Sequence, residues 1–467
     1  KVMDFKLLPL EIPSNEPFRY DALNRKSSIE FLTSLVEELK GPFVLAIDSP
    51  WGTGKTTFIN MWKAHLELDN YICIYFNSWE SDFTADPLIA FLGEIENFVK
   101  KIDPVNTEFS HSFDKAKKIA TSLTKRALPV AGKILMAGLL DSDDFSERSL
   151  ADLTSDVVKD AVDDYVATKN LNKKFHESLS NAIEKLSTDN KDGKTRKNKI
   201  IIFVDEIDRC RPTFAIELLE RIKHLFNVSN VIFILSVDKQ QLNTSLAAVY
   251  GTGINAEEYL RRFIDLEFLL PKANTERFTE YLYKGFNFDN FFQNRNILGG
   301  NEKDNLIKLF NSLSNLLDLS LRAREQCFTR IRVGMMTTPD NFFFYPILLV
   351  TLVILKTVVS GIYKKYVSDD GTATDVLDYL RFLPGGNIFL NEDLGMVVES
   401  YLIAAKNDRN VEFNQYQEKI EDPNLELEKK ARPQRIVNII YQLRQSNAVP
   451  SLKDVINKID LITQFDK

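Results

Sequence analysis

A strand, a glycine-containing loop and a helix follow one another in residues 43–66, and this segment constrains the fold more than any other part of the chain. Phe43–Ile47 is an apolar run typical of a buried strand, and Phe58–Leu66 has the pattern of a helix. The loop between them, Ser49–Thr57, contains Gly-Thr-Gly-Lys-Thr. The order strand, loop and helix predicts a phosphate-binding P-loop.

The residues of this loop suit the phosphates of a nucleotide. Gly52 and Gly54 let the backbone curl so that successive N–H groups, together with the positive end of the helix, face phosphate oxygens. Lys55 brings an ammonium group to the β- and γ-phosphates, and the hydroxyl of Thr56 is a ligand for Mg²⁺. We therefore expect ATP and Mg²⁺ as cofactors. The residues expected to bind the nucleotide are Trp51, Gly52, Thr53, Gly54, Lys55, Thr56 and Thr57.

One position departs from the P-loop pattern. The pattern GxxxxGK[ST] has a glycine where this chain has Ser49. That position is the start of the loop, where a small side chain is tolerated. The alternative interpretation is a glycine-rich turn without a ligand, and the strand-to-helix context argues against it.

A second pattern lies at the end of another apolar strand, Ile200–Val204. Asp205 follows this strand directly and is expected to hold Mg²⁺ opposite Thr56. The adjacent Glu206 is expected to orient and deprotonate the attacking water, since a carboxylate accepts a proton without becoming positive. An ordinary acidic turn at a strand end is the alternative.

Weaker candidates surround these two patterns. Asp238 follows the strand Val231–Ser236 and is expected near the γ-phosphate of the nucleotide. Arg261 and Arg262 precede the last strand, from which an arginine can reach a phosphate across a subunit interface. Surface charges or structural ion pairs are the alternative for each of these residues.

Five apolar runs alternate with helical patterns, which predicts an α/β fold with a five-stranded parallel sheet covered on both faces. The expected strands are Phe43–Ile47, Tyr71–Phe76, Ile200–Val204, Val231–Ser236 and Asp265–Leu270. Beyond Pro271 the patterns are helical only. We expect four parts: a nucleotide-binding core (1–101 and 198–272), a helical insertion (102–197), a helical lid (273–385) and a C-terminal helical region (386–467).

The composition excludes several classes of protein. With 44% hydrophobic and 27% charged residues among 467, the chain is typical of a globular protein with a large core. The net charge of −7 gives no overall attraction to nucleic acid, although lysines of the insertion remain candidates (Lys115, Lys117, Lys118 and Lys125). Three separated cysteines and four scattered histidines fit neither a disulfide framework nor a metal site, which favours a cytoplasmic location.

Two apolar stretches require a choice between a buried helix and a membrane span. Ala127–Leu140 is too short to span a bilayer. Phe342–Tyr363 is longer, but Pro346 and Lys356 interrupt it, so a buried helix is expected and a transmembrane helix is the alternative. The N-terminus shows no apolar region of a signal peptide.

Taken together, these motifs resemble the KAP family of P-loop NTPases over about residues 18–335. The segments that carry the resemblance are Asp21–Arg25, Phe43–Thr57, Phe76–Trp79, Ile202–Cys210, Pro212, Leu218–Ile222, Tyr259–Phe263 and Leu319–Arg322. The chain departs from the family pattern at Ser49, which replaces a glycine, and at Glu206, which replaces a second aspartate.

The resemblance implies an ATPase with an ASCE-type, AAA-like sheet and a helical lid that carries Arg322. Arg261, Arg262 or Arg322 is expected to supply transition-state charge. It also implies a member without membrane spans, of the kind that in bacteria is often associated with defence against phage. The expected role is a switch or motor subunit that self-associates and binds other defence proteins. Two alternatives stay open: a nucleotide-dependent scaffold with little turnover, and a translocase stimulated by nucleic acid.

Overall fold

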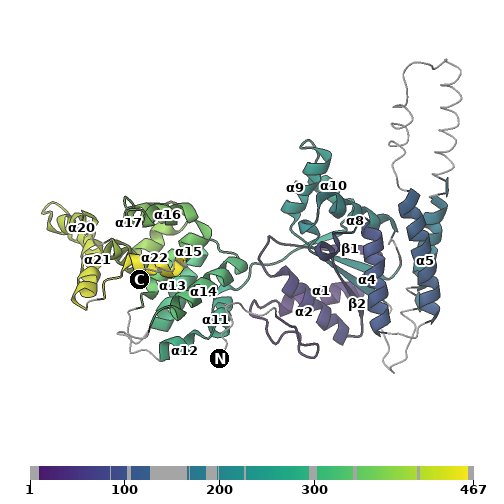
Figure 1. The fold of residues 1–467 in the computed structure, drawn as a ribbon, viewed down its shortest axis with the longest axis horizontal. Coiled ribbons are helices and arrows are strands. Elements are labelled where there is room, and N and C mark those ends of the chain that lie inside the picture. The colour runs from purple at the N-terminus through teal and green to yellow at the C-terminus, as the bar shows by residue number, and fades with distance from the viewer. Residues whose placement is uncertain are drawn as a thin grey trace, which may run out of the picture. The chain divides into compact units, whose positions relative to one another are not determined.

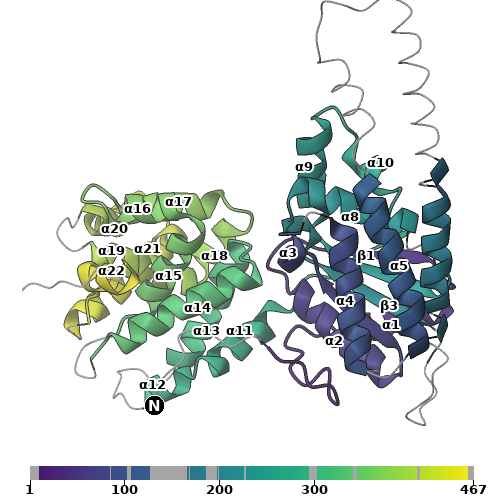
Figure 2. The same ribbon diagram turned by 45° about the vertical axis from the view of Figure 1, so that its right-hand side comes forward.

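The computed structural model divides the chain into two compact units, each described here by itself (Figures 1 and 2). The sheet unit comprises Ile12–Asp21 and Arg25–Pro271, and the helical unit comprises the residues from Lys272 onward together with Leu10, Glu11 and Ala22–Asn24. The structure describes residues 10–84, 86–102, 107–126, 166–167, 169–182, 184–185, 197, 199–225, 228–293, 302–339, 344–406, 411–446 and 448–460.

The sheet unit contains five parallel strands in the order β2-β3-β4-β1-β5, which confirms the predicted fold class. The strands are β1 (Phe43–Asp48), β2 (Ile72–Asn77), β3 (Ile200–Asp205), β4 (Val231–Val237) and β5 (Leu266–Leu269). The strand β4 lies between the P-loop strand β1 and the acidic strand β3. Every residue of β3 and β4 is buried, as expected for central parallel strands.

Helices cover both faces of this sheet because alternate residues of each strand face opposite sides. Leu45 and Ile47 pack with α1 (Lys26–Glu38) and α2 (Lys55–Leu68). Val44 and Ala46 share a core with helices on the other face. Those helices are α4 (Pro87–Ile102), α5 (Thr107–Arg126), α8 (Pro212–Leu225), α9 (Lys239–Tyr250) and α10 (Ala256–Leu260).

Part of the predicted helical insertion belongs to this same core. Phe113 of α5 and Phe175, in the helical residues 169–182, are buried in the cluster that contains the sheet. Of the candidate nucleic-acid lysines, Lys117 pairs with Glu96 at 2.7 Å, while Lys115 and Lys118 are exposed. The side chain of Lys125 and the stretch Ala127–Leu140 lie outside the described residues.

The helical unit has one apolar core that extends from Leu282 to Ile459, so the predicted boundary at residue 385 falls inside it. No strand occurs among its described residues. Its helices are α11 (Thr275–Gly285), α12 (Phe288–Gln293), α13 (Glu302–Leu316), α14 (Leu321–Met336), α15 (Pro346–Val358), α16 (Ser360–Val367), α17 (Ala373–Phe382), α18 (Gly386–Asn391), α19 (Asp393–Ala405), α20 (Val411–Glu421), α21 (Leu427–Gln445) and α22 (Leu452–Asp460).

The apolar stretch Phe342–Tyr363 does not form one helix. Pro346 begins α15, and Val359, with φ −130° and ψ 58°, separates α15 from α16. Residues 346–355 of α15 are all buried, which confirms a buried helix. Among the helices that the structure describes, none is both long enough and apolar enough to cross a bilayer.

A buried arginine that the sequence patterns did not single out connects three elements of the helical unit. Arg324 of α14 is 1% exposed and donates to the carbonyl of Leu319 at 3.3 Å, to Thr279 Oγ1 at 3.4 Å and to Asn315 Oδ1 at 2.6 Å. Burial lowers the pKa of Arg324 to about 10. Its partners are neutral oxygens, so the guanidinium is held by hydrogen bonds from several elements.

We expect Arg324→Ala to lower the free energy of unfolding of the helical unit by about 2–4 kcal/mol, because it leaves buried acceptors without donors and opens a cavity. Denaturant unfolding of the full chain measures this loss. Arg322→Ala, at an exposed position on the same helix, is the matched control and should change stability by about 0.5 kcal/mol or less. Equal stability of the two variants would contradict this role.

Two segments of the sheet unit meet at the points where the chain passes between the units. The guanidinium of Arg25, 2% exposed, donates to the carbonyl of Pro271. Asp21 Oδ2 accepts the backbone N–H groups of Arg25, at 2.7 Å, and Lys26, at 3.0 Å. The preceding Leu270 N–H donates to the carbonyl of Asp48 at 3.0 Å, at the last residue of β1. The motif Asp21–Arg25 therefore has a structural role: its Arg25 binds Pro271, just after β5, and we call this contact the clamp of Arg25 on Pro271.

Candidate functional site

The loop between β1 and α2 has the conformation that the glycines predict. Gly52 and Gly54 have φ angles of 76° and 86°, in the left-handed region that other residues rarely adopt. Gly54 is the N-cap of α2, so the first helical residue is Lys55. The positive end of α2 and the free N–H groups of its first turn thus lie at the carboxyl edge of the sheet, where a phosphate is stabilised.

Ser49 fits the start of the loop through hydrogen bonds that a glycine cannot make. Its side chain is buried, and its Oγ donates to Thr53 Oγ1 at 2.7 Å. Thr53 Oγ1 in turn donates to the carbonyl of Pro50 at 2.8 Å. The serine at this position is therefore compatible with a closed P-loop.

The ammonium group of Lys55 is held inside the loop. The residue is 9% exposed, and Nζ donates to the carbonyl of Ser49 and, at 3.3 Å, to that of Pro50. Burial lowers the pKa of Lys55, and the carboxylates of Asp208, Asp238, Asp205 and Asp48 oppose this shift. A phosphate would supply the negative charge that compensates this buried cation.

Asp205 ends β3 on the face of the sheet that α2 covers, since Ile201 and Phe203, at alternate positions, pack in the core with α2. It is 2% exposed, and its Oδ2 accepts the hydroxyl proton of Tyr75 at 3.1 Å. The Tyr75 contact was not predicted, and it orients the carboxylate. The pKa of Tyr75 is raised by its burial and by this carboxylate.

Asp205 and Thr56 are the residues available for Mg²⁺, and their oxygens suit that hard cation. Within the described residues, no group of three or more histidine, cysteine or acidic side chains is arranged to hold a metal ion. In a nucleotide site, phosphates and water provide most ligands of Mg²⁺, so a few protein oxygens are enough. The donor set is therefore compatible with Mg²⁺ that binds together with a nucleotide.

Glu206 occupies an unusual backbone position directly after β3. Its φ of 60° and ψ of 23° lie in the left-handed region. Its side chain is 14% exposed, and Oε1 pairs with Arg209 Nη1 at 2.7 Å. Burial raises the pKa of Glu206, while Arg209 and a hydrogen bond from Asn77, at the end of β2, oppose the shift. The structure thus shows Glu206 engaged with a cation from its own turn.

Asp238 accepts hydrogen bonds from the backbone with both carboxylate oxygens. It is the N-cap of α9, where Oδ1 accepts the N–H of Gln241 at 3.3 Å. Its Oδ2 accepts the backbone N–H of Trp51 at 3.1 Å. Asp238 is therefore adjacent to the P-loop, and its expected contact with the nucleotide stays a prediction.

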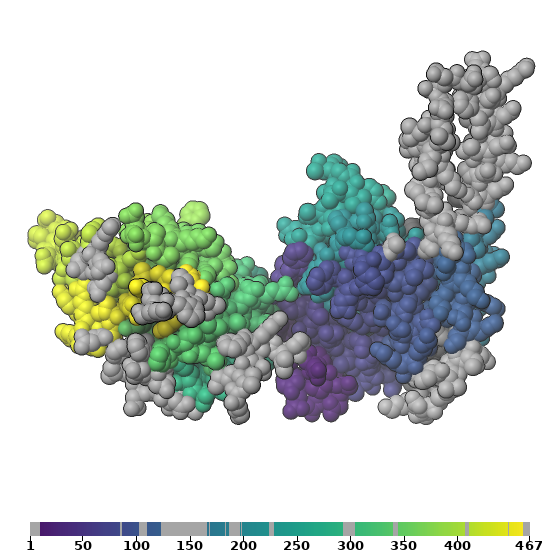
Figure 3. Space-filling model, viewed as in Figure 1, coloured from purple at the N-terminus to yellow at the C-terminus, as the bar shows by residue number. Residues whose placement is uncertain are grey.

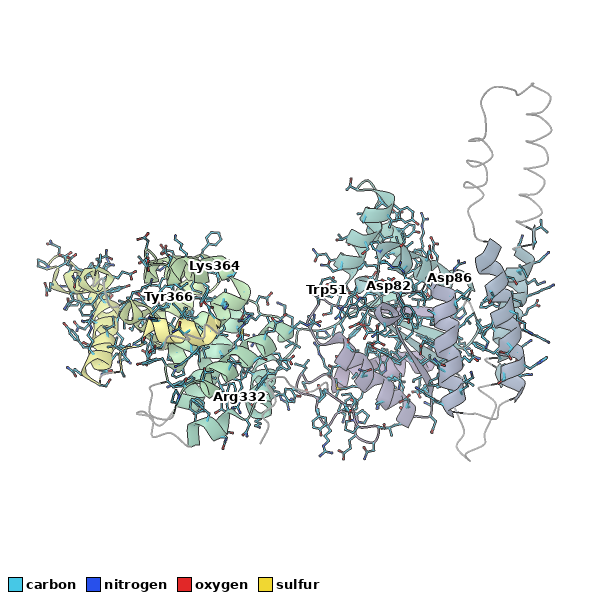
Figure 4. The ribbon with its side chains drawn as sticks, in the orientation of Figure 1. Trp51, Asp82, Asp86, Arg332, Lys364 and Tyr366 are labelled. Atoms are coloured by element: carbon cyan, nitrogen blue, oxygen red, sulfur yellow. The ribbon has the colours of Figure 1, made fainter. Side chains whose placement is uncertain are left out.

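Asp208, the third residue after the end of β3, joins the same group. It is 7% exposed, and its Oδ2 accepts the indole N–H of Trp51 and the backbone N–H of Asp238, the latter at 3.1 Å. Trp51 can be located in Figure 4, on the sheet unit. No sequence motif pairs Asp208 with Trp51, because 157 positions separate them.

Two of the three predicted arginines lie in the sheet unit, and they do not join its P-loop. Arg261 and Arg262 lie in an exposed turn after α10. The N–H of Asp265, three residues later, donates to the carbonyl of Val44 at the beginning of β1. Arg261 and Arg262 therefore lie near the amino edge of the sheet, whereas the P-loop lies at its carboxyl edge. Arg322 is exposed in the first turn of α14, in the helical unit.

The model of the KAP family P-loop domain matches residues 25–333, which include the P-loop, the acidic end of β3 and most of α14. A search of curated proteins gave no match.

Proposed function

The chain belongs to the KAP family of P-loop NTPases, and on that premise we propose that it binds and hydrolyses ATP as a switch or motor subunit of a larger complex. The single observation that supports this most strongly is the buried ammonium of Lys55, held at the start of α2 inside a loop built on Gly52 and Gly54. Such a loop provides N–H donors and one cation to the same small volume, which is the chemistry that a triphosphate requires.

In this proposal the residues at the carboxyl edge of the sheet divide the work. Lys55 and the N–H groups of the loop bind the phosphates, while Thr56 and Asp205 hold Mg²⁺. When bound, Mg²⁺ neutralises charge on the β- and γ-phosphates. Tyr75 fixes the orientation of Asp205 through its hydrogen bond. Glu206 accepts a proton from the attacking water once its side chain is released from Arg209.

The nucleotide-dependent scaffold is the second candidate, and the ion pair between Glu206 and Arg209 favours it. Arg209 Nη1 occupies Glu206 Oε1 at 2.7 Å, so this oxygen is not available to the attacking water until Arg209 moves away. Slow basal turnover follows if Arg209 is not displaced. A turnover measurement on the purified chain separates the two functions, because the scaffold binds ATP with little release of phosphate.

Membership of a bacterial anti-phage defence complex is the finer part of the proposal, and the family resemblance alone supports it. Self-association and defence proteins as partners belong to the same proposal. The test is to purify the chain together with the products of neighbouring genes and to determine particle masses with and without ATP. A mass equal to that of the single chain under both conditions would argue against assembly.

Lys55→Ala is expected to abolish ATP binding while the sheet unit remains folded. The substitution removes a charge-assisted contact to phosphate that contributes about 1.5–3 kcal/mol or more. Calorimetric titration with ATP measures the affinity, and the unfolding midpoint reports the fold.

Lys63→Ala is the matched control for this prediction. Lys63 lies on the same helix, and its ammonium pairs with Glu67 at 2.7 Å, one turn further along. This variant should bind ATP like the wild type. Unchanged ATP affinity in Lys55→Ala would contradict the assignment of the loop.

A further inference from the structure

We propose that Asp208 is a positioning residue for nucleotide binding, because its carboxylate fixes the P-loop tryptophan, Trp51, against the turn that carries Glu206. This inference rests on the proposed function, since it concerns how the nucleotide site is kept in shape. It assigns a role to a side chain that neither touches the phosphates nor binds the metal.

Two hydrogen-bond donors converge on one oxygen of Asp208. Asp208 Oδ2 accepts the indole N–H of Trp51, a P-loop residue, and the backbone N–H of Asp238, at the start of α9. The carboxylate therefore joins three segments: the P-loop, the turn after β3 and the end of β4. Its burial, with 7% of the residue exposed, keeps water from replacing either donor.

Trp51 is held at both of its N–H groups. Asp208 accepts the indole N–H, and Asp238 Oδ2 accepts the backbone N–H at 3.1 Å. The backbone N–H of Trp51 thus points to Asp238. Gly52 follows Trp51 directly and has a left-handed backbone conformation. The backbone direction at Trp51 therefore sets where this left-handed turn of the P-loop begins.

Two carboxylates beside a phosphate site repel the ligand unless donors compensate them. Here Asp208 receives two N–H donors and Asp238 receives two, and both carboxylates stabilise the charged form of Lys55. Asp208 and Asp238 thus hold the loop in one conformation, while Lys55 and the N–H groups that bond to the two carboxylates offset their negative charge.

Two substitutions at Asp208 separate geometry from charge. Since both hydrogen bonds end on the same oxygen, Asp208→Asn can keep both through its carbonyl oxygen, whereas Asp208→Ala removes both. We expect Asp208→Ala and Trp51→Phe each to weaken ATP binding about ten- to a hundredfold, and Asp208→Asn to restore most of the affinity. The double variant Trp51→Phe/Asp208→Ala should bind no more weakly than the weaker single variant, because both changes remove the same contact.

A spectroscopic measurement reports the contact without ATP. The chain contains three tryptophans, so labelling with 5-fluorotryptophan gives three ¹⁹F resonances, and Trp51→Phe identifies that of Trp51. The Trp51 resonance should shift in Asp208→Ala and stay close to its wild-type position in Asp208→Asn. A merely structural carboxylate would give no such difference between the two variants.

Asp265→Ala is the matched control. Asp265 also accepts a backbone N–H, that of Val44 at 2.8 Å, but it lies at the opposite edge of the sheet from the P-loop. This variant should lose stability without losing ATP affinity.

The outcomes distinguish the inference from the proposed function. Wild-type affinity in Asp208→Ala, or losses that multiply in the double variant, would overturn the inference alone. Wild-type chain that binds no ATP would overturn the proposed function and this inference with it. If Asp208→Ala does not fold, Trp51→Phe decides, because Trp51 is 44% exposed and its loss leaves no buried cavity. Undiminished ATP affinity in that variant would overturn the inference.

Discussion

Glu206→Gln should bind ATP and Mg²⁺ about as tightly as the wild type and hydrolyse ATP ~10²–10⁴-fold more slowly. Glutamine has the same shape as glutamate and still accepts a hydrogen bond from Arg209, but it cannot take a proton from water. The left-handed backbone conformation at position 206 is equally unfavourable for glutamate and for glutamine, so the substitution should not change the stability of the fold. The variant is therefore expected to accumulate in the ATP-bound state.

Single-turnover release of phosphate measures this effect, and Glu80→Gln is the control. Glu80 is an exposed carboxylate that follows β2 at the same edge of the sheet, so its variant removes the same charge near the site. It should hydrolyse ATP at the wild-type rate. Near-normal turnover in Glu206→Gln would place the base on another residue, and Asp208 would be tested next, although its Oδ2 already accepts two N–H groups.

Replacement of both Arg261 and Arg262 by alanine should reduce hydrolysis ~10³–10⁵-fold, the range found where an arginine compensates transition-state charge. The register of β5 with β1 gives a specific reason to expect this contact between subunits. Leu45 is level with Leu266 and Asp48 with Leu269, so the turn that contains the arginines precedes the edge opposite the P-loop. The six residues of β1 separate the amino and carboxyl edges of the sheet by about 15–20 Å.

Several features of the turn leave its cations available to a neighbouring molecule. Neither arginine forms an ion pair with Glu257 or Asp265 in the described part of the chain; Asp265 pairs with Lys223 at 3.4 Å. The guanidinium of Arg262 lies 5.4 Å from the ring centre of Tyr259. The helices α9 and α10, which lead to this turn, project from the body of the sheet unit in Figures 1 and 3.

A mixing experiment tests whether the arginines act across an interface. Arg261→Ala/Arg262→Ala protein lacks the cations, and Lys55→Ala protein lacks the nucleotide site, so a mixture should recover part of the activity that each lacks. Specific activity of the wild type should also rise with protein concentration. Lys115→Ala/Lys118→Ala, which removes two exposed charges from α5, is the control and should be fully active. A specific activity independent of concentration, with normal hydrolysis by the arginine variant, would refute the interface.

The fold could be predicted because its strands are local apolar runs with clear ends. The apolar composition and the length of the runs were enough to predict β1, β3 and β4, since a central parallel strand is buried on both faces. The boundary inside Phe342–Tyr363 could not be predicted in this way. Val358 and Val359 continue the apolar pattern of α15, and only the backbone angles of Val359 show where that helix ends.

The site was only partly predictable for a similar reason. Lys55, Asp205 and Glu206 follow from motifs in which spacing along the chain fixes the chemistry. The contacts of Asp208 with Trp51 and of Tyr75 with Asp205 join residues more than a hundred positions apart, and only the order of the strands brings them together. The N-cap role of Asp238, by contrast, had a local signal. Asp238 directly precedes a helix, and aspartate is common at that position.

The clamp of Arg25 on Pro271 has a mechanical consequence. The chain leaves the sheet unit after Pro271, so tension on the residues that follow is carried first by the contact of Arg25 with Pro271 and then by the hydrogen bonds between β5 and β1. A pull along the axis of a strand loads those bonds in shear, and they resist together instead of opening one after another. Leu270 is bonded to Asp48, and Ser49 comes next in the chain. A force exerted on the far side of Pro271 therefore reaches the first residue of the P-loop through a single strand, with no helix in between.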